Sequence, residues 1–169
     1  MALYLIPNGP MQTTAAFAAV TTGTSIKTML QVKPSATIAA KIVEWGISFD
    51  GSAAATPIKV ELIETDVAAT VTASVAADIT KLDGNALSGG DPTTNLIQVG
   101  TTSTGYTSTS EGSTTSIRNF DVQFIAPTNQ YVKQFPLGRE PIIQVSKFAR
   151  IRVTAGAAVN AYCYMVVEV

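Results

Sequence analysis

The sequence predicts an all-β protein, a jelly-roll-like antiparallel β-sandwich of about eight strands. Three observations lead to this prediction. Several segments alternate apolar and polar residues, which is the pattern of a half-buried strand. Turn signals separate these segments at roughly the 8–12-residue spacing that is typical of sandwiches. Finally, only a short stretch near Phe17 shows a helical period.

The end of the chain shows the alternation most clearly. Residues 147–155 and 161–169 are two alternating segments separated by a short turn, and we expect them to pair as antiparallel strands. In the first segment Ala149, Ile151 and Val153 share one face, and the two arginines lie on the other. An immunoglobulin-like sandwich is the alternative architecture, although its paired cysteines are absent.

The earlier strands are bounded by turn signals such as Asp50-Gly51 and by Pro34. The expected strands before the closing pair are residues 25–33, 41–49, 57–65, 67–75, 95–99, 117–125 and 131–137. In the clearest of them, Val43, Trp45 and Ile47 fall on one face together with Phe49. This phase predicts that Trp45 belongs to the core and does not stack on a sugar.

Residues 1–24 are expected to form an N-terminal arm, and residues 25–169 a single sandwich domain. The arm begins with an apolar run that ends at a Pro-Asn-Gly-Pro cluster, and residues 13–20 are expected to form one or two helical turns. Apolar side chains favour burial, so we expect the arm to lie on a neighbouring subunit. Deletion of residues 1–10 should then abolish attachment to that subunit without unfolding the sandwich. The expected interface residues in the arm are Leu3, Tyr4, Leu5, Ile6 and Phe17.

Residues 100–116 are nearly all Thr, Ser and Gly around Tyr106 and Glu111. Such a segment buries little apolar area, so we expect an exposed loop or a flexible hairpin that projects outward. Tyr106 is a further expected interface residue. It would also serve an alternative function, in which this polar surface binds glycans.

The charge content is low for a soluble domain. Of 169 residues, 11 are basic and 12 acidic, so 14% are charged and the net charge is −1. About 25% is usual. A surface with so little charge is poorly protected against association, which favours contacts with other copies or with a partner.

The absence of a basic stripe argues against nucleic acid as a partner, and no apolar run is long enough for a membrane helix. The first residues also lack the features of a signal peptide.

Catalytic chemistry is not expected. The sequence has no histidine, which removes the commonest general base and the commonest transition-metal ligand. A carboxylate pair for glycoside hydrolysis stays formally open. Glu61, however, falls on a strand face that the pattern predicts to be exposed. The carboxylates considered for such a pair are Asp50, Glu61, Glu64, Asp121 and Glu140.

No cofactor or metal is expected either. Asp83-Gly84-Asn85 begins like a calcium loop but lacks the remaining ligands, so a turn explains it. The one cysteine, Cys163, cannot form an internal disulfide and lies on the apolar face of the last strand. We expect it to be a small buried hydrophobe.

Five segments resemble small β-sandwich virion proteins of tailed bacteriophages. They are residues 19–32, 42–51 (Ile-Val-Glu-Trp-Gly-Ile-Ser-Phe-Asp-Gly), 57–62, 134–138 (Gln-Phe-Pro-Leu-Gly) and 149–155. The likeness rests on strand patterns, without a chemical signature. It implies a structural role on the virus particle, most often as a head decoration or cement protein, and such proteins are commonly trimers.

The resemblance also implies partners and a location. The partners would be the major capsid protein and further copies of this chain as a homotrimer. The location would be the capsid surface of the virion, after synthesis in the cytoplasm of the host bacterium. Two alternatives stay open. One is another virion component from the tail, neck or fibre, and the other is the glycan-binding module.

Overall fold

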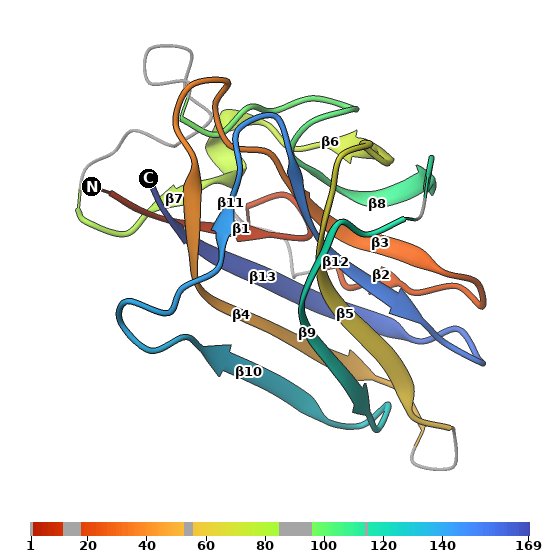
Figure 1. Ribbon diagram of the computed structural model, residues 1–169. Helices are drawn as coiled ribbons and strands as arrows, with labels where there is room; N and C mark the ends of the chain where they lie inside the picture. Colours follow the sequence, from red (N-terminus) through yellow and green to blue (C-terminus); the bar gives the residue numbers. More distant parts are fainter. Residues whose placement is uncertain (1, 12–17, 53–55, 85–95, 114) are drawn as a thin grey trace.

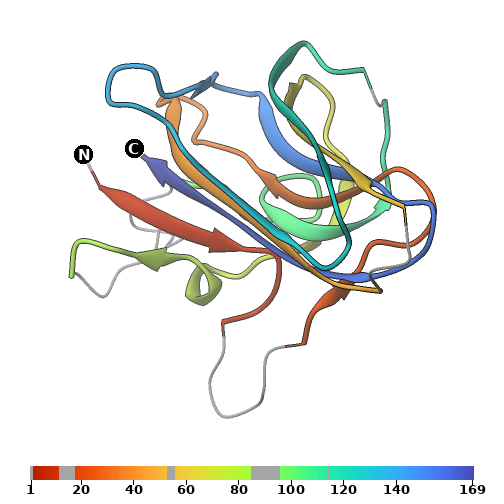
Figure 2. The same ribbon diagram turned by 90° about the horizontal axis from the view of Figure 1, so that it is seen from below.

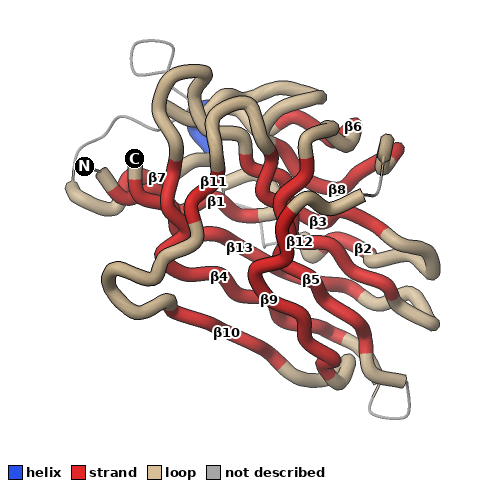
Figure 3. The backbone as a smooth tube through the Cα atoms, viewed as in Figure 1, coloured by secondary structure: helices blue, strands red, loops and turns tan. Residues whose placement is uncertain are grey.

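Strands from both halves of the sequence form two antiparallel sheets that pack face to face in the computed structural model (Figure 1). The predicted all-β sandwich is therefore confirmed. Figure 2 shows the two layers edge-on, and Figure 3 shows how little of the described chain is helical. The structure describes residues 2–11, 18–52, 56–84, 96–113 and 115–169.

The first sheet has seven strands, and the closing strand of the chain lies near its centre. The main path runs β10 (Gln130–Gln134), β4 (Ala40–Asp50), β13 (Asn160–Glu168), β1 (Leu3–Pro7) and β7 (Thr80–Lys81). Two short strands join it, with β11 (Ile142–Ile143) on β4 and β2 (Val20–Thr21) on β13. β10 and β7 are thus the opposite ends of this path.

The second sheet has six strands. Its order is β6 (Thr70–Ala73), β8 (Gly105–Ser110), β3 (Lys27–Val32), β12 (Phe148–Thr154), β5 (Ile58–Thr65) and β9 (Arg118–Ile125). A single 3₁₀ turn, η1 (Ala76–Asp78), links β6 to β7 within the described residues. The expected strand at residues 95–99 forms only isolated bridges, between Ile97 and Pro34 and between Val99 and Thr104; Asn95 itself lies outside the described residues.

The core lies between the sheets and takes largely alternate residues from the central strands of both, β1, β4 and β13 in one and β3, β5 and β12 in the other. Trp45 is fully buried there, as its phase predicts, and Cys163 is buried on β13. Val43 departs from the predicted phase. The register of β4 against β13 shifts between Val166 and Val167, so Val43 has no partner on β13. This β-bulge turns Val43 out of the core and brings its neighbour Ile42 in.

The N-terminal segment differs from the expected arm. β1 pairs with β13 along its whole length and with β7 on its other side. The side chains of Tyr4 and Ile6 are fully buried in the core, whereas Leu3 and Leu5 face outward. Residues 3–7 therefore belong to the sandwich, because two of their side chains complete its core. Phe17 and most of residues 13–20 lie outside the described residues.

The Thr- and Ser-rich segment also differs from the expected loop. β8 is a strand of the six-stranded sheet and pairs with β3 and β6. Tyr106 lies opposite Leu30, a core residue, so its side chain is on the inner side of the sheet and is partly buried. Backbone pairing on both sides holds this segment in place, although its side chains contribute little apolar area.

Candidate functional site

The outer face of the seven-stranded sheet presents apolar side chains on two neighbouring strands. Leu5 on β1 lies opposite Val166 on β13, and Pro7 lies opposite Tyr164. All four are partly exposed. With Leu3, which is 36% exposed, these five residues form a surface that we call the outer apolar face. Of the residues expected at an interface, this face includes Leu3 and Leu5 but not Tyr4 or Ile6.

Tyr164 is held in a defined position on this face. Its ring covers Gly46 on the adjacent strand β4, and its hydroxyl donates a hydrogen bond of 2.6 Å to Glu44 Oε1. Burial and the hydrogen bond to Glu44 both raise the pKa of Tyr164. The tyrosine is thus neutral and fixed at physiological pH, and it offers a flat apolar ring to a partner at little cost in side-chain entropy.

A pocket of about 320 Å³ continues the outer apolar face toward the β7 edge. We call it the apolar pocket. Among the described residues that line it only Asp78 is charged, and it accepts hydrogen bonds from Met11 N at 3.0 Å and from Val75 N at 2.9 Å. The pocket is lined by Leu5, Pro7, Pro10, Met11, Asp78, Thr80 and Tyr162. The composition of the pocket suits an apolar side chain that has a positively charged group close to it.

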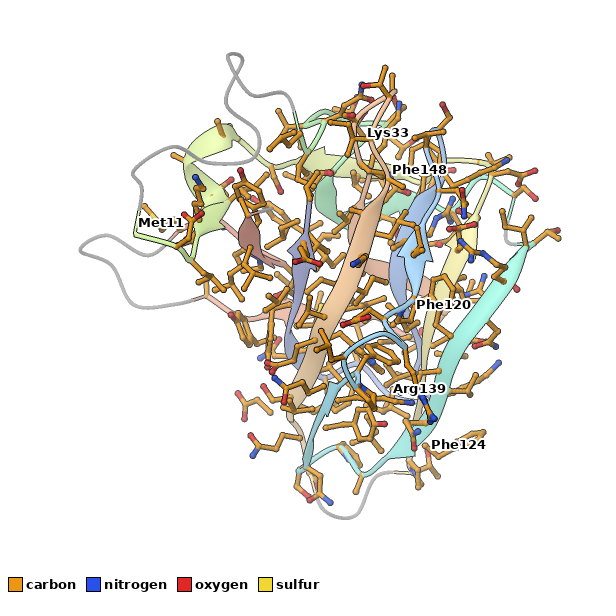
Figure 4. All side chains as sticks on the ribbon, turned by 60° about the vertical axis from the view of Figure 1, so that its left-hand side comes forward. Met11, Lys33, Phe120, Phe124, Arg139 and Phe148 are labelled. Carbon is orange, nitrogen blue, oxygen red and sulfur yellow. The ribbon has the colours of Figure 1, made fainter. Side chains whose placement is uncertain are left out.

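The most exposed apolar side chain lies at the other end of this sheet, in the turn that follows β10. Leu137 is 96% exposed, more than any other large hydrophobic residue of the described chain. Phe124 on the edge strand β9 is 72% exposed. Figure 4 shows Met11, at the apolar pocket, well away from Arg139 in the turn after β10. Apolar contact points therefore lie at both ends of the seven-stranded sheet.

The outer face of the six-stranded sheet has a buried charge network. Arg150 is fully buried and donates hydrogen bonds to the carbonyl oxygens of Glu111 and Val67. Arg152 is buried too and contacts Glu61 at 3.1 Å. Because Arg150 lies beneath covering loops and Arg152 pairs with Glu61, these arginines offer a partner little free charge. The predicted exposure of Glu61 is wrong, since the side chain is 5% exposed in this network.

Ion pairs set the ionisation of this network. Burial opposes the charge on Glu61, but hydrogen bonds from Lys59 and Arg152 outweigh it, so the pKa of Glu61 is lowered. Burial lowers the pKa of Arg150, while Glu111 at 3.6 Å acts in the opposite direction. The network joins four strands and the loops above them, which gives it a structural role.

The other carboxylates considered for catalysis are each tied to a basic group or lie apart. Glu64 pairs with Arg118, and Asp121 pairs with Lys133 at 3.2 Å. Asp121 also accepts a hydrogen bond of 3.0 Å from Tyr131. Burial and this hydrogen bond raise the pKa of Tyr131 to about 12. Asp50 ends β4, and Glu140 lies in the loop between β10 and β11.

A second, polar pocket of about 240 Å³ lies beside β8. Thr22–Lys27 and Ser108–Glu111 line it. The carboxylate of Glu111 is already engaged, because it accepts hydrogen bonds from Thr28 N at 2.6 Å and Thr28 Oγ1 at 2.7 Å. Tyr106 does not line this pocket. The structure thus separates the predicted glycan-contacting tyrosine from the hydroxyl-rich hollow.

Within the described part of the chain, no group of three or more His, Cys, Asp or Glu side chains is placed to hold a metal ion. Burial raises the pKa of the Cys163 thiol, which disfavours the reactive thiolate. Among the described residues no helix is long and apolar enough to cross a bilayer.

Comparisons of this chain with protein-family models, with curated proteins and with solved structures found no match. The function is therefore inferred from the surfaces of this chain and from its sequence.

Several residues of the candidate site were not predictable from the sequence. The alternation places Tyr164 and Val166 on the strand face opposite Cys163 but does not show what lies beside them, and no sequence pattern singles out Met11 or Asp78. Leu137 has a local signal, since Pro136-Leu137-Gly138 is a turn sequence that exposes the residue after proline. The apolar pocket has no such signal, because its walls come from segments about 150 residues apart in the chain.

Proposed function

We propose that this chain is a non-enzymatic virion structural protein, a decoration or cement protein on the head of a tailed bacteriophage. Its partners are the major capsid protein and other copies of itself in a homotrimer. We further propose that its two-sheet sandwich is jelly-roll-like. The observation that supports this function best is the outer apolar face, where apolar side chains of two neighbouring strands lie side by side on a sheet.

The physical requirements of a cement protein match this surface. Such a protein stabilises a shell by burying area across joints between capsid subunits, and a stable contact of this kind buries roughly 1,600 Å². Aromatic and aliphatic side chains on a preorganised sheet lose little entropy on binding, so more of the contact energy remains for affinity. Repetition of the contact around the shell increases the total binding strength further.

The sequence supports the same role. Only 14% of residues are charged and the net charge is −1, which suits a protein whose surface is largely covered in the assembled particle. The strand patterns resemble those of small phage virion sandwiches. The buried ion pairs at Glu61 and Glu64 stabilise the fold and leave these groups engaged.

The test is binding of the purified chain to heads assembled from the major capsid protein of its source phage and lacking this chain. We expect Leu5→Asp to lose most of the binding, because it places a charge in the centre of the outer apolar face. Phe124→Asp on the six-stranded sheet places a charge at another exposed apolar side chain, so it is the matched surface control and should bind like the wild type. Full occupancy by a folded Leu5→Asp variant would contradict the proposal.

The glycan-binding alternative has one supporting observation, the pocket lined with Thr and Ser hydroxyls beside β8. A glycan array separates the two functions. Binding that is lost in Thr109→Trp, which fills that pocket, would favour recognition of a cell surface. The decoration role predicts no glycan binding by the wild-type chain.

A further inference from the structure

The apolar pocket has the features of a receptor for one apolar side chain with an adjacent positive group. Leu5, Pro7 and Met11 supply apolar walls, and Asp78 supplies a carboxylate. Each oxygen of that carboxylate accepts one backbone hydrogen bond, so each keeps a lone pair for a further donor. Within the described chain Asp78 makes no ion pair. An arginine could therefore bind it without displacing a partner.

The turn after β10 presents a matching group. Arg139 N donates a hydrogen bond of 2.9 Å to Pro136 O, and Gly138 has a φ of 81°. These are the features of a type II turn, which places Leu137 at the outer corner. Both ends of the loop are tied to β4, through Phe135 N to Val43 O and Ile42 N to Pro141 O. Leu137 is thus an exposed side chain on a fixed support.

Charge complementarity links the turn to the pocket. Arg139 is exposed and makes no ion pair with a described residue, and it stands two positions after Leu137. The turn offers a leucine and an arginine, and the pocket offers apolar walls and an unpaired carboxylate. Phe124, the other prominent exposed hydrophobic residue, lies opposite Lys59, whose ammonium group is already paired with Glu61 at 2.7 Å. The combination of an exposed leucine and an unpaired arginine therefore favours Leu137 as the occupant of the pocket.

We propose that Leu137 of one copy docks in the apolar pocket of a second copy, with Arg139 of the first copy paired to Asp78 of the second. The turn follows β10 and the pocket adjoins β7, and these strands end the seven-stranded path at opposite sides. The contact is consequently heterologous, with each copy giving a turn and receiving another. Such head-to-tail contacts close into a ring when the rotation allows it.

This inference rests on the self-association part of the proposed function and names its contact. It does not require a capsid. The experiment therefore measures the mass of the purified chain by sedimentation equilibrium over a range of concentrations. We expect concentration-dependent association of the wild type. Leu137→Asp should weaken it at least about tenfold, and Arg139→Gln should reduce its dependence on salt.

A mixing experiment tests the head-to-tail geometry. Leu137→Asp lacks the docking leucine but keeps its pocket, whereas Thr80→Arg keeps the leucine but fills the pocket with a bulky cation. Thr80 is exposed, so this change is compatible with folding. Each variant alone should remain a monomer, and an equimolar mixture should form a dimer of one copy each. Phe124→Ser is the control for loss of an exposed apolar group and should associate like the wild type.

Three results would overturn the proposal. One is a wild-type chain that stays monomeric at every concentration. Another is a Leu137→Asp variant that associates normally, and the third is a variant mixture that fails to dimerise while the wild type associates. The proposed function is tested separately, since a monomeric chain that still binds capsids would remove this contact and leave the decoration role in place.

Discussion

The ring of Tyr164 lies against the backbone of Gly46 on the outer apolar face. A Cβ atom added to Gly46 would come within 2.7 Å of Tyr164 Cε1. The glycine therefore provides the space in which the tyrosine lies flat on the sheet, with its hydroxyl on Glu44. This pairing joins β4 to β13 on the surface that we propose as the binding face.

Gly46→Ala should displace the Tyr164 ring and break its hydrogen bond to Glu44. We expect a loss of about 1 kcal/mol in the free energy of unfolding, measured by urea denaturation. The cost should be smaller when Gly46→Ala is made in a Tyr164→Phe background, because that background has no hydrogen bond to lose. An equal cost in both backgrounds would show that the hydroxyl is not involved.

The two faces of β1 should respond differently to truncation. Ile6→Ala removes a fully buried side chain, and we expect it to cost about 2–5 kcal/mol in stability. Its neighbour Leu5 faces outward, so Leu5→Ala should cost much less. Deletion of residues 1–10 should unfold the sandwich, in contrast to the expectation for a free arm. Thermal unfolding of the three variants provides the measurement, and a folded deletion variant would contradict the central position of β1.

Arg150 should be essential to the outer network of the six-stranded sheet. Arg150→Ala removes the hydrogen bonds to Val67 and Glu111 and leaves a partly buried carboxylate without its arginine. We expect a loss of about 3–5 kcal/mol. The exposed Arg139→Ala is the control, measured where the protein is monomeric, and should change stability by no more than about 0.5 kcal/mol. Similar small effects at both sites would exclude a structural role for the network.

The ionisation of Glu61 should make the free energy of unfolding depend on pH in the acidic range. Its pKa in the folded chain lies below the ordinary value of 4.5. The unfolded chain therefore binds the proton first, so this stabilising effect is complete above about pH 4.5 and is lost as the pH falls through the lower, folded pKa. Glu61→Gln should flatten the pH dependence of the unfolding free energy in that range. Lys59→Met should move the loss to higher pH, since it removes one of the hydrogen bonds that lower the pKa. An unchanged pH profile in Glu61→Gln would disprove this assignment.

The fold was predictable where a strand has one apolar face. Residues 41–49, 57–65 and 117–125 were expected as strands, and the structure places β4, β5 and β9 there within one or two residues. Trp45 and Cys163 were placed in the core for the same reason. The bulge at Val43 was not predictable, because it depends on the register with β13, which is distant in the chain.

The candidate site was less predictable, because it depends on which strands become neighbours. The apolar run from Leu3 to Ile6 indicated burial, but alternation alone does not show whether the covering partner is another subunit or the chain's own core. Pairing with β13 assigns Tyr4 and Ile6 to the core and leaves Leu3 and Leu5 outside. Likewise, the burial of Arg150 was not predictable, because loops that cover a strand face leave no trace in the alternation of that strand.

The most direct test of the decoration role is a cryo-electron microscopy map of the source phage particle. The account predicts density for this sandwich on the outside of the head, with the outer apolar face, including Leu5 and Tyr164, turned toward the major capsid protein. A head without this density, or the chain located in the tail or in a fibre, would contradict it.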